Sequence, residues 1–392
     1  MEQFFILALA VIMAIFVSPL FFDLALCIAG NLFRARSPRP QLRRAIRLAV
    51  IVPAHDEETM IARTVLSLKA ADADTPIYVV AHNCSDGTAK AAAHAGAKVV
   101  ELNNTLLRGK GAALRHGFAA AFADGANAVL VIDADSLVSA NLIHATQSLL
   151  EQGADAVQCR YELELTETRA THPMSRLRAL AFRGMNVLRA RGRAGLGFST
   201  GLFGNGFALT ASLLDRVAFN VNSIAEDVEY HTRLVEQGVP VYWIGDAFVH
   251  ADSPASSKAQ ATQEARWEGG RVRVASRATG KLLDALLRGK WRALETLADV
   301  WSLPLSRGIL ALLLTTFLAV PWLHVFALAC AAITLLYVLQ SALLGKEPGK
   351  DLLALAAAPL YLVWKALITP LVLRQSRSRA EWARTKREAP QP

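Results

Sequence analysis

The amino-acid sequence predicts an α/β domain with a mostly parallel sheet, carried by a chain that also enters a membrane. Two observations lead to this prediction. Between Arg47 and about Gly280, short apolar runs alternate with alanine-rich segments of helical period. Outside that range, apolar stretches are long enough to span a bilayer, and 53% of all 392 residues are hydrophobic.

The first apolar segment, residues 1–33, is expected to be an N-terminal transmembrane anchor. It exceeds the roughly 20 apolar residues that a span requires. No small-residue cleavage site follows it, so we expect a retained anchor and not a removed signal peptide. Arginines crowd the segment that follows, which predicts that residue 34 onward lies on the cytoplasmic side. The polar residues inside the run are Ser18, Asp23 and Asn31.

The net charge of +9 comes largely from basic residues beside the apolar segments. The sequence has no zinc-finger, RNA-recognition or helix-turn-helix pattern, so an anionic lipid surface is the expected partner and nucleic acid is not. The cysteines have no paired spacing, which argues against disulfides and a thiolate metal site. They are Cys27, Cys84, Cys159 and Cys330.

The domain expected over residues 45–280 has five apolar runs that predict strands. Because they alternate with helical segments, the sheet should be mostly parallel, with ligands bound at the carboxyl ends of its strands. The runs are Leu48–Val52, Ile77–Ala81, Val99–Val100, Ala128–Ile132 and Ala156–Cys159.

Three of these strands run into polar segments, "IVPAHDEE", "VVAHNCSDGTA" and "VLVIDADS". A structural explanation is available for some of the acids. Glu57 and Glu58 could complement the dipole of the following helix, and Asp86 could be a helix N-cap. A ligand site at this edge of the sheet is the alternative.

Asp133 and Asp135 follow the fourth strand and are two residues apart. Alternate residues of an extended chain point the same way, so the two carboxylates should lie on one side. Bound Mg²⁺ or Mn²⁺ would relieve their repulsion. A helix cap plus a surface acid is the bland alternative.

The segment "SIAEDVEYHTRL" places Ser223 three residues before Glu226, the pattern of a capping box. That pattern does not explain Asp227, which could remove a proton from an acceptor hydroxyl. Upstream, "GLGFSTGLFGNGFAL" is rich in glycine and would allow either close backbone approach or a movable loop.

Taken in order, "VPAHDEE", "RGKGAAL", "DAD", "FGNGFAL", "AED" and "QEARW" resemble the motifs of membrane-embedded family 2 glycosyltransferases. This group contains cellulose, chitin-oligosaccharide and hyaluronan synthases. The resemblance covers about residues 45–275. It implies a GT-A fold, a nucleotide-sugar donor that is usually UDP-linked, and transfer of the sugar with inversion.

The resemblance also implies roles for individual residues. Those expected around the nucleotide are Pro53, His55, Glu57, Asp86, Lys110 and Asp133. Asp133 and Asp135 match the metal motif, with Asp135 the direct ligand, and Asp227 matches the catalytic base.

Gln263, Arg266 and Trp267 match the Q-x-x-R-W motif that borders the acceptor and the donor pyrophosphate. An arginine fork can pair with pyrophosphate, and a tryptophan face can stack on a sugar. An interfacial helix with tryptophan at the headgroups is the alternative.

The sequence departs from many relatives at Ala81 and His82, where an acid usually contacts uracil. Asp86 or Asn83 could then read the base, or the donor is not a UDP-sugar. His82 could instead be a hydrogen-bonded turn histidine.

After Gly280 the chain is expected to return to the membrane. Lys365 interrupts the last apolar run. In an alternative topology, one long tilted helix replaces a transmembrane hairpin and residues 352–373 form a full span. This alternative also leaves the basic C-terminal tail on the cytoplasmic side. The expected segments are an amphipathic interface helix at 285–306, a transmembrane hairpin at 307–345 broken near Pro321, an interfacial, re-entrant or transmembrane helix at 352–373, and a basic cytoplasmic tail at 374–392.

The predicted function is inverting, metal-dependent transfer to a growing envelope or extracellular glycan at the cytoplasmic membrane. About three spans are few for a polymer channel, so a homo-oligomer or partner subunits would have to supply more. The first alternative is a lipid acceptor such as polyprenyl phosphate, ceramide or diacylglycerol. The second is an inactive scaffold or nucleotide-sugar sensor.

Overall fold

The computed structural model describes residues 1–33, 45–107, 109–165, 170–221, 223, 225–252 and 257–376. The arginines of the expected basic flank at 34–44, and the expected tail from residue 377 on, lie outside these residues. The described chain divides into two compact units. The sheet unit comprises 45–164 and 199–263, and the helical unit comprises 1–33, 165–198 and 264–376.

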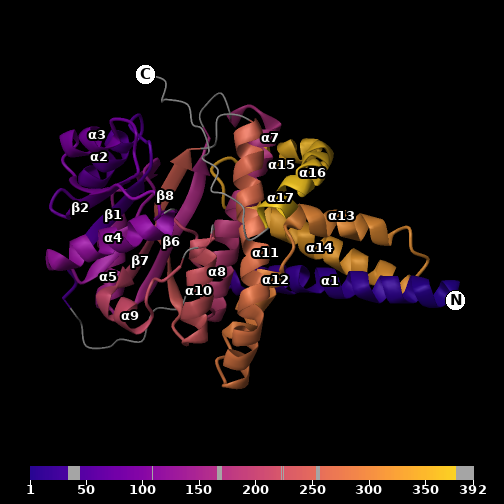
Figure 1. The fold of residues 1–392 in the computed structure, drawn as a ribbon. Coiled ribbons are helices and arrows are strands. Elements are labelled where there is room, and N and C mark those ends of the chain that lie inside the picture. The colour runs from indigo at the N-terminus through magenta and orange to yellow at the C-terminus, as the bar shows by residue number, and fades with distance from the viewer. Residues whose placement is uncertain are drawn as a thin grey trace. The chain divides into compact units, whose positions relative to one another are not determined.

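In the sheet unit, the described residues form one eight-stranded sheet of order β3-β2-β1-β4-β7-β6-β8-β5 (Figure 1). The neighbours from β3 to β4 are parallel, β6 and β8 are also parallel, and β7 and β5 run antiparallel to their neighbours. The strands are β1 Leu48–Ala54, β2 Ile77–His82, β3 Lys98–Leu102, β4 Ala128–Val131, β5 Ser136–Val138, β6 Ala156–Glu164, β7 Phe207–Thr210 and β8 Val241–Asp252.

All five predicted strands are present, and the mixed, largely parallel α/β fold is confirmed. The central strands are apolar throughout because helices cover both faces of a parallel sheet. Helix α4 packs on β1 and β2, and α5 packs on β6 and β8 (Figure 1). The helices of this unit are α2 Ile61–Ala71, α3 Thr88–His94, α4 Lys110–Ala123, α5 Leu142–Glu151, α9 Ala211–Arg216 and α10 Glu226–Glu236.

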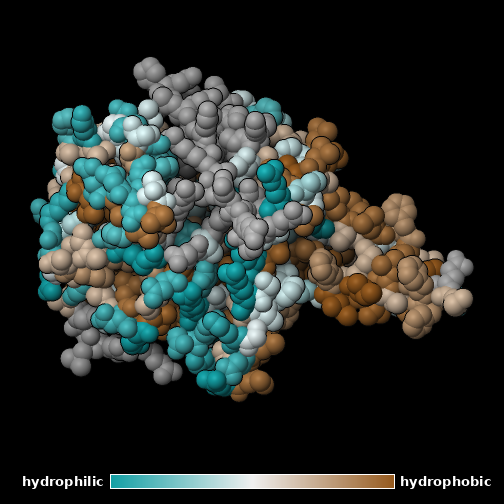
Figure 2. All heavy atoms as spheres, viewed as in Figure 1, coloured by the Kyte–Doolittle hydropathy of each residue, from teal (hydrophilic) through white to brown (hydrophobic). Residues whose placement is uncertain are grey.

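In the helical unit, three described helices are long and apolar enough to cross a membrane: Gln3–Gly30, Pro321–Leu343 and Pro348–Arg374. A fourth span results if the pair Ala293–Trp301 and Leu305–Thr315, bent by 70°, counts as one. Figure 2 shows hydrophobic residues gathered over α1, α13 and α14.

The elements of this unit are α1 Glu2–Gly30, α7 Pro173–Arg183, the π-helical turn η1 Gly184–Leu188, α8 Arg189–Leu196, α12 Ala293–Trp301, α13 Leu305–Thr315, α14 Pro321–Leu343, α15 Pro348–Leu353, η2 Ala354–Ala357, α16 Ala358–Leu367 and α17 Thr369–Gln375, together with α11 Ser257–Leu287 from Glu264 onward.

Asp23, which interrupts the N-terminal apolar run, is completely buried inside this unit. Its carboxylate accepts hydrogen bonds from the Arg189 and Arg193 guanidinium groups of α8, and the distance to Arg193 is 3.1 Å. Both arginines also pair with Asp299 of α12, at 2.7 and 2.9 Å. The acid that breaks the apolar pattern is therefore the point at which α1 is tied to α8.

Small residues let α1 and α8 approach closely where they cross. A Cβ added to Gly192 would lie 2.2 Å from the carbonyl oxygen of Cys27, and one added to Gly195 would lie 2.1 Å from that of Gly30. Gly195, the first glycine of the glycine-rich segment, thus belongs to a helix crossing and not to a loop.

Several expected segment boundaries differ from the observed elements. Residues 165–198 group with the helical unit, although they fall inside the domain expected at 45–280. Helix α11 runs through residue 280 to Leu287, so the range 285–306 contains the end of α11, all of α12 and the start of α13. In the range 307–345, α13 ends at Thr315 and α14 begins at Pro321.

Candidate functional site

The carboxyl ends of β1 and β2 form two adjacent turns, because the strands pair in parallel with Pro53 opposite Val80. Two non-glycine residues with positive φ, Asp56 at 54° and Asn83 at 51°, lie in these turns. Such strained conformations gather at functional sites. Nδ1 of His55 donates a hydrogen bond to the carbonyl of His82 (2.7 Å), which ties the first turn to the second.

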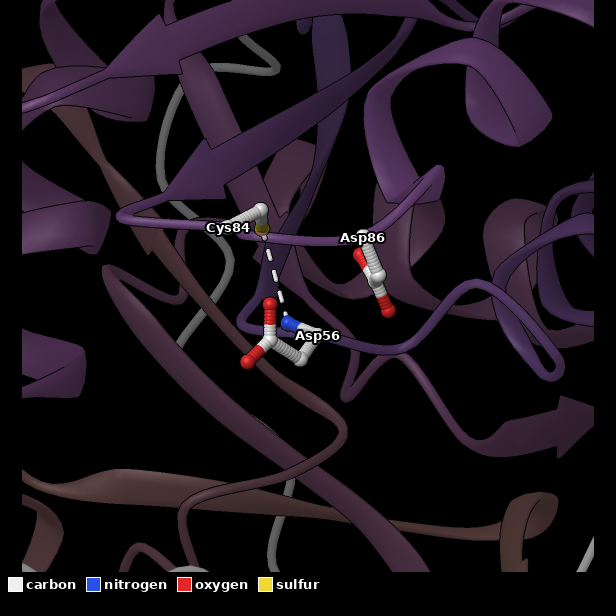
Figure 3. A group of neighbouring side chains, drawn as sticks. All are labelled: Asp56, Cys84 and Asp86. Atoms are coloured by element: carbon white, nitrogen blue, oxygen red, sulfur yellow. Dashed lines mark hydrogen bonds between the residues drawn. The ribbon is translucent and has the colours of Figure 1, made fainter.

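Asp56, Cys84 and Asp86 form a group whose ligand-type atoms lie within 4.8 Å of one another (Figure 3). Oδ1 of Asp56 accepts the N–H of Ser85 at 2.6 Å. The N–H of Asp56 donates to Sγ of Cys84 at 3.5 Å (Figure 3). Burial raises the pKa of the Cys84 thiol, which favours the neutral form over the thiolate that binds metals. The group therefore acts as a brace between the two turns.

Asp86 supports the start of α3 from outside the helix. Its carboxylate accepts the N–H of Thr88 (3.0 Å) and the N–H of Glu58 (3.2 Å). The N-cap position itself belongs to Gly87, so the expected N-cap role of Asp86 is wrong by one residue. Glu57 is held through its backbone, whose N–H donates to Oγ1 of Thr88 (2.8 Å).

His82 and Asn83 are committed to holding the segment that follows β3. Nε2 of His82 donates to the carbonyl of Leu107 (2.8 Å), and burial lowers the pKa of this imidazole. The Asn83 side chain accepts the N–H of Asn104 (2.7 Å) and donates to the carbonyl of Asn104 (3.0 Å). His82, the last residue of β2, is thus a hydrogen-bonded histidine, and the Asn83 amide is used inside the protein.

Lys110, the first residue of α4, brings separate parts of the chain together. Its ammonium lies 2.5 Å from Oδ1 of Asp133, which follows β4, and 2.5 Å from the carbonyl oxygen of Gly204. A Cβ added to Gly204 would lie 3.2 Å from Oδ2 of Asp227 and 3.7 Å from the Lys110 ammonium. Lys110, Asp133 and Asp227 therefore surround one glycine, and we call these four residues the Lys110 cluster.

The glycine motif "FGNGFAL" is held in place by backbone bonds. Gly206 donates to the carbonyl of Val131 (2.9 Å) and accepts from Cys159 (2.8 Å). Gly204 and Gly206 have φ of 75° and 70°, which glycine adopts without strain. Of the two explanations for these glycines, the structure supports close backbone approach.

The charge of the Lys110 cluster is unusual. Burial opposes the charge of Lys110, but Asp133, Glu226 and Asp227 outweigh it, and the pKa of Lys110 is raised. Burial also raises the pKa of Glu226 to about 7, against the lowering effect of Lys110. Several acids thus converge on one ammonium, and this environment suits a further cation.

Glu226 is not part of a capping box. Helix α10 starts at Glu226 itself, its N-cap is Ala225, and this cap residue makes no side-chain hydrogen bond. The expected pairing with Ser223 is therefore wrong. Asp227 is the next residue, and its Oδ1 accepts the N–H of Val228 (2.8 Å).

Asp133 and Asp135 offer oxygen donors of the kind that Mg²⁺ and Mn²⁺ bind. The Asp133 side chain is 30% exposed, whereas Asp135 is buried, with 4% exposed. Lys110 already compensates Asp133, so charge repulsion alone does not require a metal. In donor chemistry the two carboxylates suit such a metal nonetheless.

The sequence reading overlooked His250. His250 lies on β8 directly opposite Leu137 of β5. Leu137 is two residues after Asp135 in the sequence. Directly opposed residues of antiparallel strands share a face, so this imidazole lies on the same face as Leu137. The twelve-residue strand β8 has polar residues within it and is not a continuous apolar run, so the hydrophobic pattern did not predict it.

The Q-x-x-R-W residues lie on α11, which continues from the sheet unit into the helical unit. Gln263 is buried, with 6% exposed, and belongs to the sheet unit. Arg266 and Trp267 belong to the helical unit, where the Trp267 ring lies 6.0 Å from that of Phe182 on α7.

Residues 45–270 match the family described as "Glycosyltransferase like family 2". This chain belongs to that family. Protein RfbJ of Shigella flexneri is 31% identical over 123 residues, which cover 30% of this glycosyltransferase and 88% of RfbJ. The resemblance inferred from the ordered motifs is confirmed, and the protein is a nucleotide-sugar glycosyltransferase of family 2.

A solved structure shares the fold of this glycosyltransferase. It is the mannosyltransferase PcManGT from Pyrobaculum calidifontis in complex with GDP-Man and Mn²⁺. The sequences are 18% identical, the TM-score is 0.57, and the match covers 95% of this chain and 97% of PcManGT. The predicted GT-A fold is therefore confirmed.

Proposed function

We propose that this enzyme transfers a sugar, with inversion and with the help of a divalent metal, to an acceptor held at the cytoplasmic face of a membrane. The sequence predicts a growing envelope glycan as the acceptor, with a lipid as the alternative. One observation favours the lipid. The helix that carries Arg266 and Trp267 is built into the unit that contains the candidate membrane spans.

The donor is proposed to bind at the turns after β1 and β2, among Pro53, His55, Glu57 and Asp86. A UDP-sugar is the donor expected from the sequence. A GDP-sugar is the second candidate, since Ala81 and His82 replace the acid that contacts uracil, and PcManGT binds GDP-Man. Both nucleotides therefore belong in any donor screen.

In the proposed reaction, Asp227 accepts the proton of the acceptor hydroxyl, which attacks the anomeric carbon from the face opposite the nucleotide. Lys110 adds positive charge beside Asp133, in the nucleotide pocket. Asp133 and Asp135 would hold Mg²⁺ or Mn²⁺, which would neutralise charge on the departing diphosphate. The presence of Mn²⁺ in PcManGT supports this metal assignment.

The Q-x-x-R-W residues have proposed roles toward the same substrates. The Arg266 fork pairs with the pyrophosphate, the Trp267 face stacks on a sugar, and Gln263 orients hydroxyl groups. We propose a multi-pass protein of the cytoplasmic membrane, with residues 45–280 inside the cell. Copies of the chain or partner subunits would supply further spans if a polymer is exported.

The test uses the full chain in nanodiscs with Mg²⁺ or Mn²⁺. A panel of UDP- and GDP-sugars is screened for release of free nucleotide, with and without an extract of membrane lipids. We expect one donor to be used, with release stimulated several-fold by the lipid extract. Release that is unchanged by the lipid extract would overturn the lipid acceptor. Binding without release from any donor would instead support the scaffold or sensor.

A further inference from the structure

Lys365 interrupts the last apolar segment, and in the structure its ammonium is buried between two acids of α11. It pairs with Glu264, and it lies 2.9 Å from Oε1 of Glu268. The three side chains are 9%, 8% and 11% exposed. A lysine that faced lipid from within an apolar helix would be costly, whereas a lysine that faces two carboxylates is explained.

Two arginines complete this group. Nε of Arg178, on α7, lies 3.4 Å from Oε1 of Glu264, and Arg307, on α13, pairs with Glu268. We call Lys365, Glu264, Glu268, Arg178 and Arg307 the Lys365 cluster. Helices α7, α13 and α16 thus all attach to α11 at the same two acids.

The two acids flank Arg266 and Trp267 in the sequence. Because successive helical residues are about 100° apart, Glu264 and Glu268 lie on one face of α11. Arg266 is about 180° from the middle of that face, and Trp267 is at its edge. Holding both acids therefore sets the rotation of α11 about its axis and, with it, the direction of Arg266.

Loss of Lys365 should loosen this attachment without destroying the unit. Arg178 and Arg307 would still face one acid each. The contacts of α13 with α14 and of α1 with α8 do not involve Lys365. The expected consequence is a change in the orientation of α11 in a folded protein.

We propose that Lys365 is a positioning residue for the Q-x-x-R-W motif: by holding Glu264 and Glu268, it aims Arg266 from the opposite face of α11. This inference rests on the proposed role of Arg266 at the donor pyrophosphate. It assigns a function to the charge that the sequence places in an apolar helix.

The kinetic test compares Lys365→Met with Lys365→Arg and with Lys350→Met, whose lysine is 65% exposed in a surface pair with Glu347. We expect Lys365→Met to lower kcat about 10- to 100-fold while the donor KM changes less than about twofold, the pattern of a lost transition-state interaction. Lys365→Arg should recover kcat to within about threefold, and Lys350→Met should match the unaltered enzyme. An unchanged kcat for Lys365→Met, or a parallel loss in Lys350→Met, would overturn the proposal.

One further variant, Glu268→Gln, serves if Lys365→Met does not fold, and a double variant tests the contact with Glu264 where Lys365→Met does fold. Glu268→Gln leaves the pair between Lys365 and Glu264 intact, and we expect the same selective loss of kcat. The kcat of the double variant Glu264→Gln, Lys365→Met should fall about as far as that of the more impaired single variant and no further. Both changes break the contact between Lys365 and Glu264. Fully additive losses would show that Lys365 does not act through Glu264.

A readout independent of turnover separates this inference from the proposed function. In a Cys84→Ser background, a cysteine is introduced by Arg266→Cys, and its rate of labelling by a maleimide is measured. We expect Lys365→Met to change that rate at least threefold, and Lys350→Met to leave it unchanged. Equal rates would overturn the positioning role even if no nucleotide-sugar is ever turned over.

Discussion

The Lys110 ammonium lies 2.5 Å from Oδ1 of Asp133. Lys110 begins α4 and Asp133 follows β4, so the two residues are 23 positions apart in the sequence. The lysine and aspartate side chains are 18% and 30% exposed. A second pair, Lys98 with Asp124, has a similar distance of 2.6 Å but is 58% and 51% exposed. The chain therefore contains a matched comparison of the same ion pair in the proposed site and on the surface.

Lys110→Met should lower kcat/KM by about 100-fold, because the partly buried Asp133 and the donor phosphates lose their positive neighbour. Lys98→Met should change kcat/KM less than twofold, since a solvent-exposed pair is screened by water and lies outside the proposed site. Nucleotide release by the two variants is the measurement. If Lys110→Met and Lys98→Met released nucleotide at similar rates, Lys110 would have no role in the proposed site.

Asp227→Asn should lower kcat by about 10² to 10⁴-fold with donor binding retained, as expected for a general base that does not hold the donor. Asp215→Asn, at an exposed position on α9, is the control. Turnover and nucleotide affinity are measured separately. Near-normal turnover by Asp227→Asn would assign the base to another group.

Asp135→Ala should abolish the effect of Mg²⁺ or Mn²⁺ on nucleotide affinity, because its buried carboxylate is the proposed direct ligand. Affinity is measured by calorimetry with metal and with a chelator. In the unaltered protein, adding the chelator should weaken binding. If metal still tightens binding to Asp135→Ala, the metal lies elsewhere.

Glu226 predicts a dependence of stability on pH. Its pKa is about 7 in the folded protein and 4.5 in its ordinary state, because burial disfavours the charge. The protonated group is therefore favoured in the folded state, and its contribution to stability is complete below about pH 4.5 and lost as the pH rises through about 7. The folded protein should lose stability over this interval.

The measurement is the Tm in detergent and metal-free buffer at pH 5.5 and 8.5. Glu226→Gln should show a smaller fall in Tm between these values than the unaltered protein. Glu101→Gln, at an exposed position on β3, should follow the unaltered protein. Parallel curves for all three proteins would contradict the raised pKa of Glu226.

The sequence predicted the parallel half of the sheet because those strands are buried on both faces and read as apolar runs. It missed β5 and β7, which have three and four residues, and β8, whose twelve residues include Gly245 and Asp246. His250, on β8, was missed for the same reason. Local hydrophobicity does not reveal a short or irregular strand that is stabilised mainly by its neighbours.

The capping-box prediction failed for a related reason. Ser223 and Glu226 have the required spacing, but Glu226 is partly buried and lies near Lys110, which is 116 residues earlier in the chain. Likewise, the sequence marked Asp23 and Lys365 as exceptions in apolar runs without showing why. Their partners, Arg193 and Glu264, are 170 and 101 residues away and are brought near only by the fold.

The crossing of α1 and α8 allows one further test, with two glycine-to-alanine changes in helices of the same unit. Gly192→Ala would place a Cβ 2.2 Å from the carbonyl oxygen of Cys27, whereas nothing lies within 4 Å of a Cβ at Gly280 on α11. Alanine favours a helix by about 1 kcal/mol over glycine, so Gly280→Ala should raise the Tm slightly.

Gly192→Ala should instead lower the stability by roughly 1 to 3 kcal/mol, because the clash involves backbone that cannot rotate away. The Tm of both variants is measured in the same detergent. We expect opposite shifts, since the two substitutions share their helix propensity and differ only in the space around the new methyl group. If Gly192→Ala is as stable as Gly280→Ala, then α1 is not packed against α8 through this glycine.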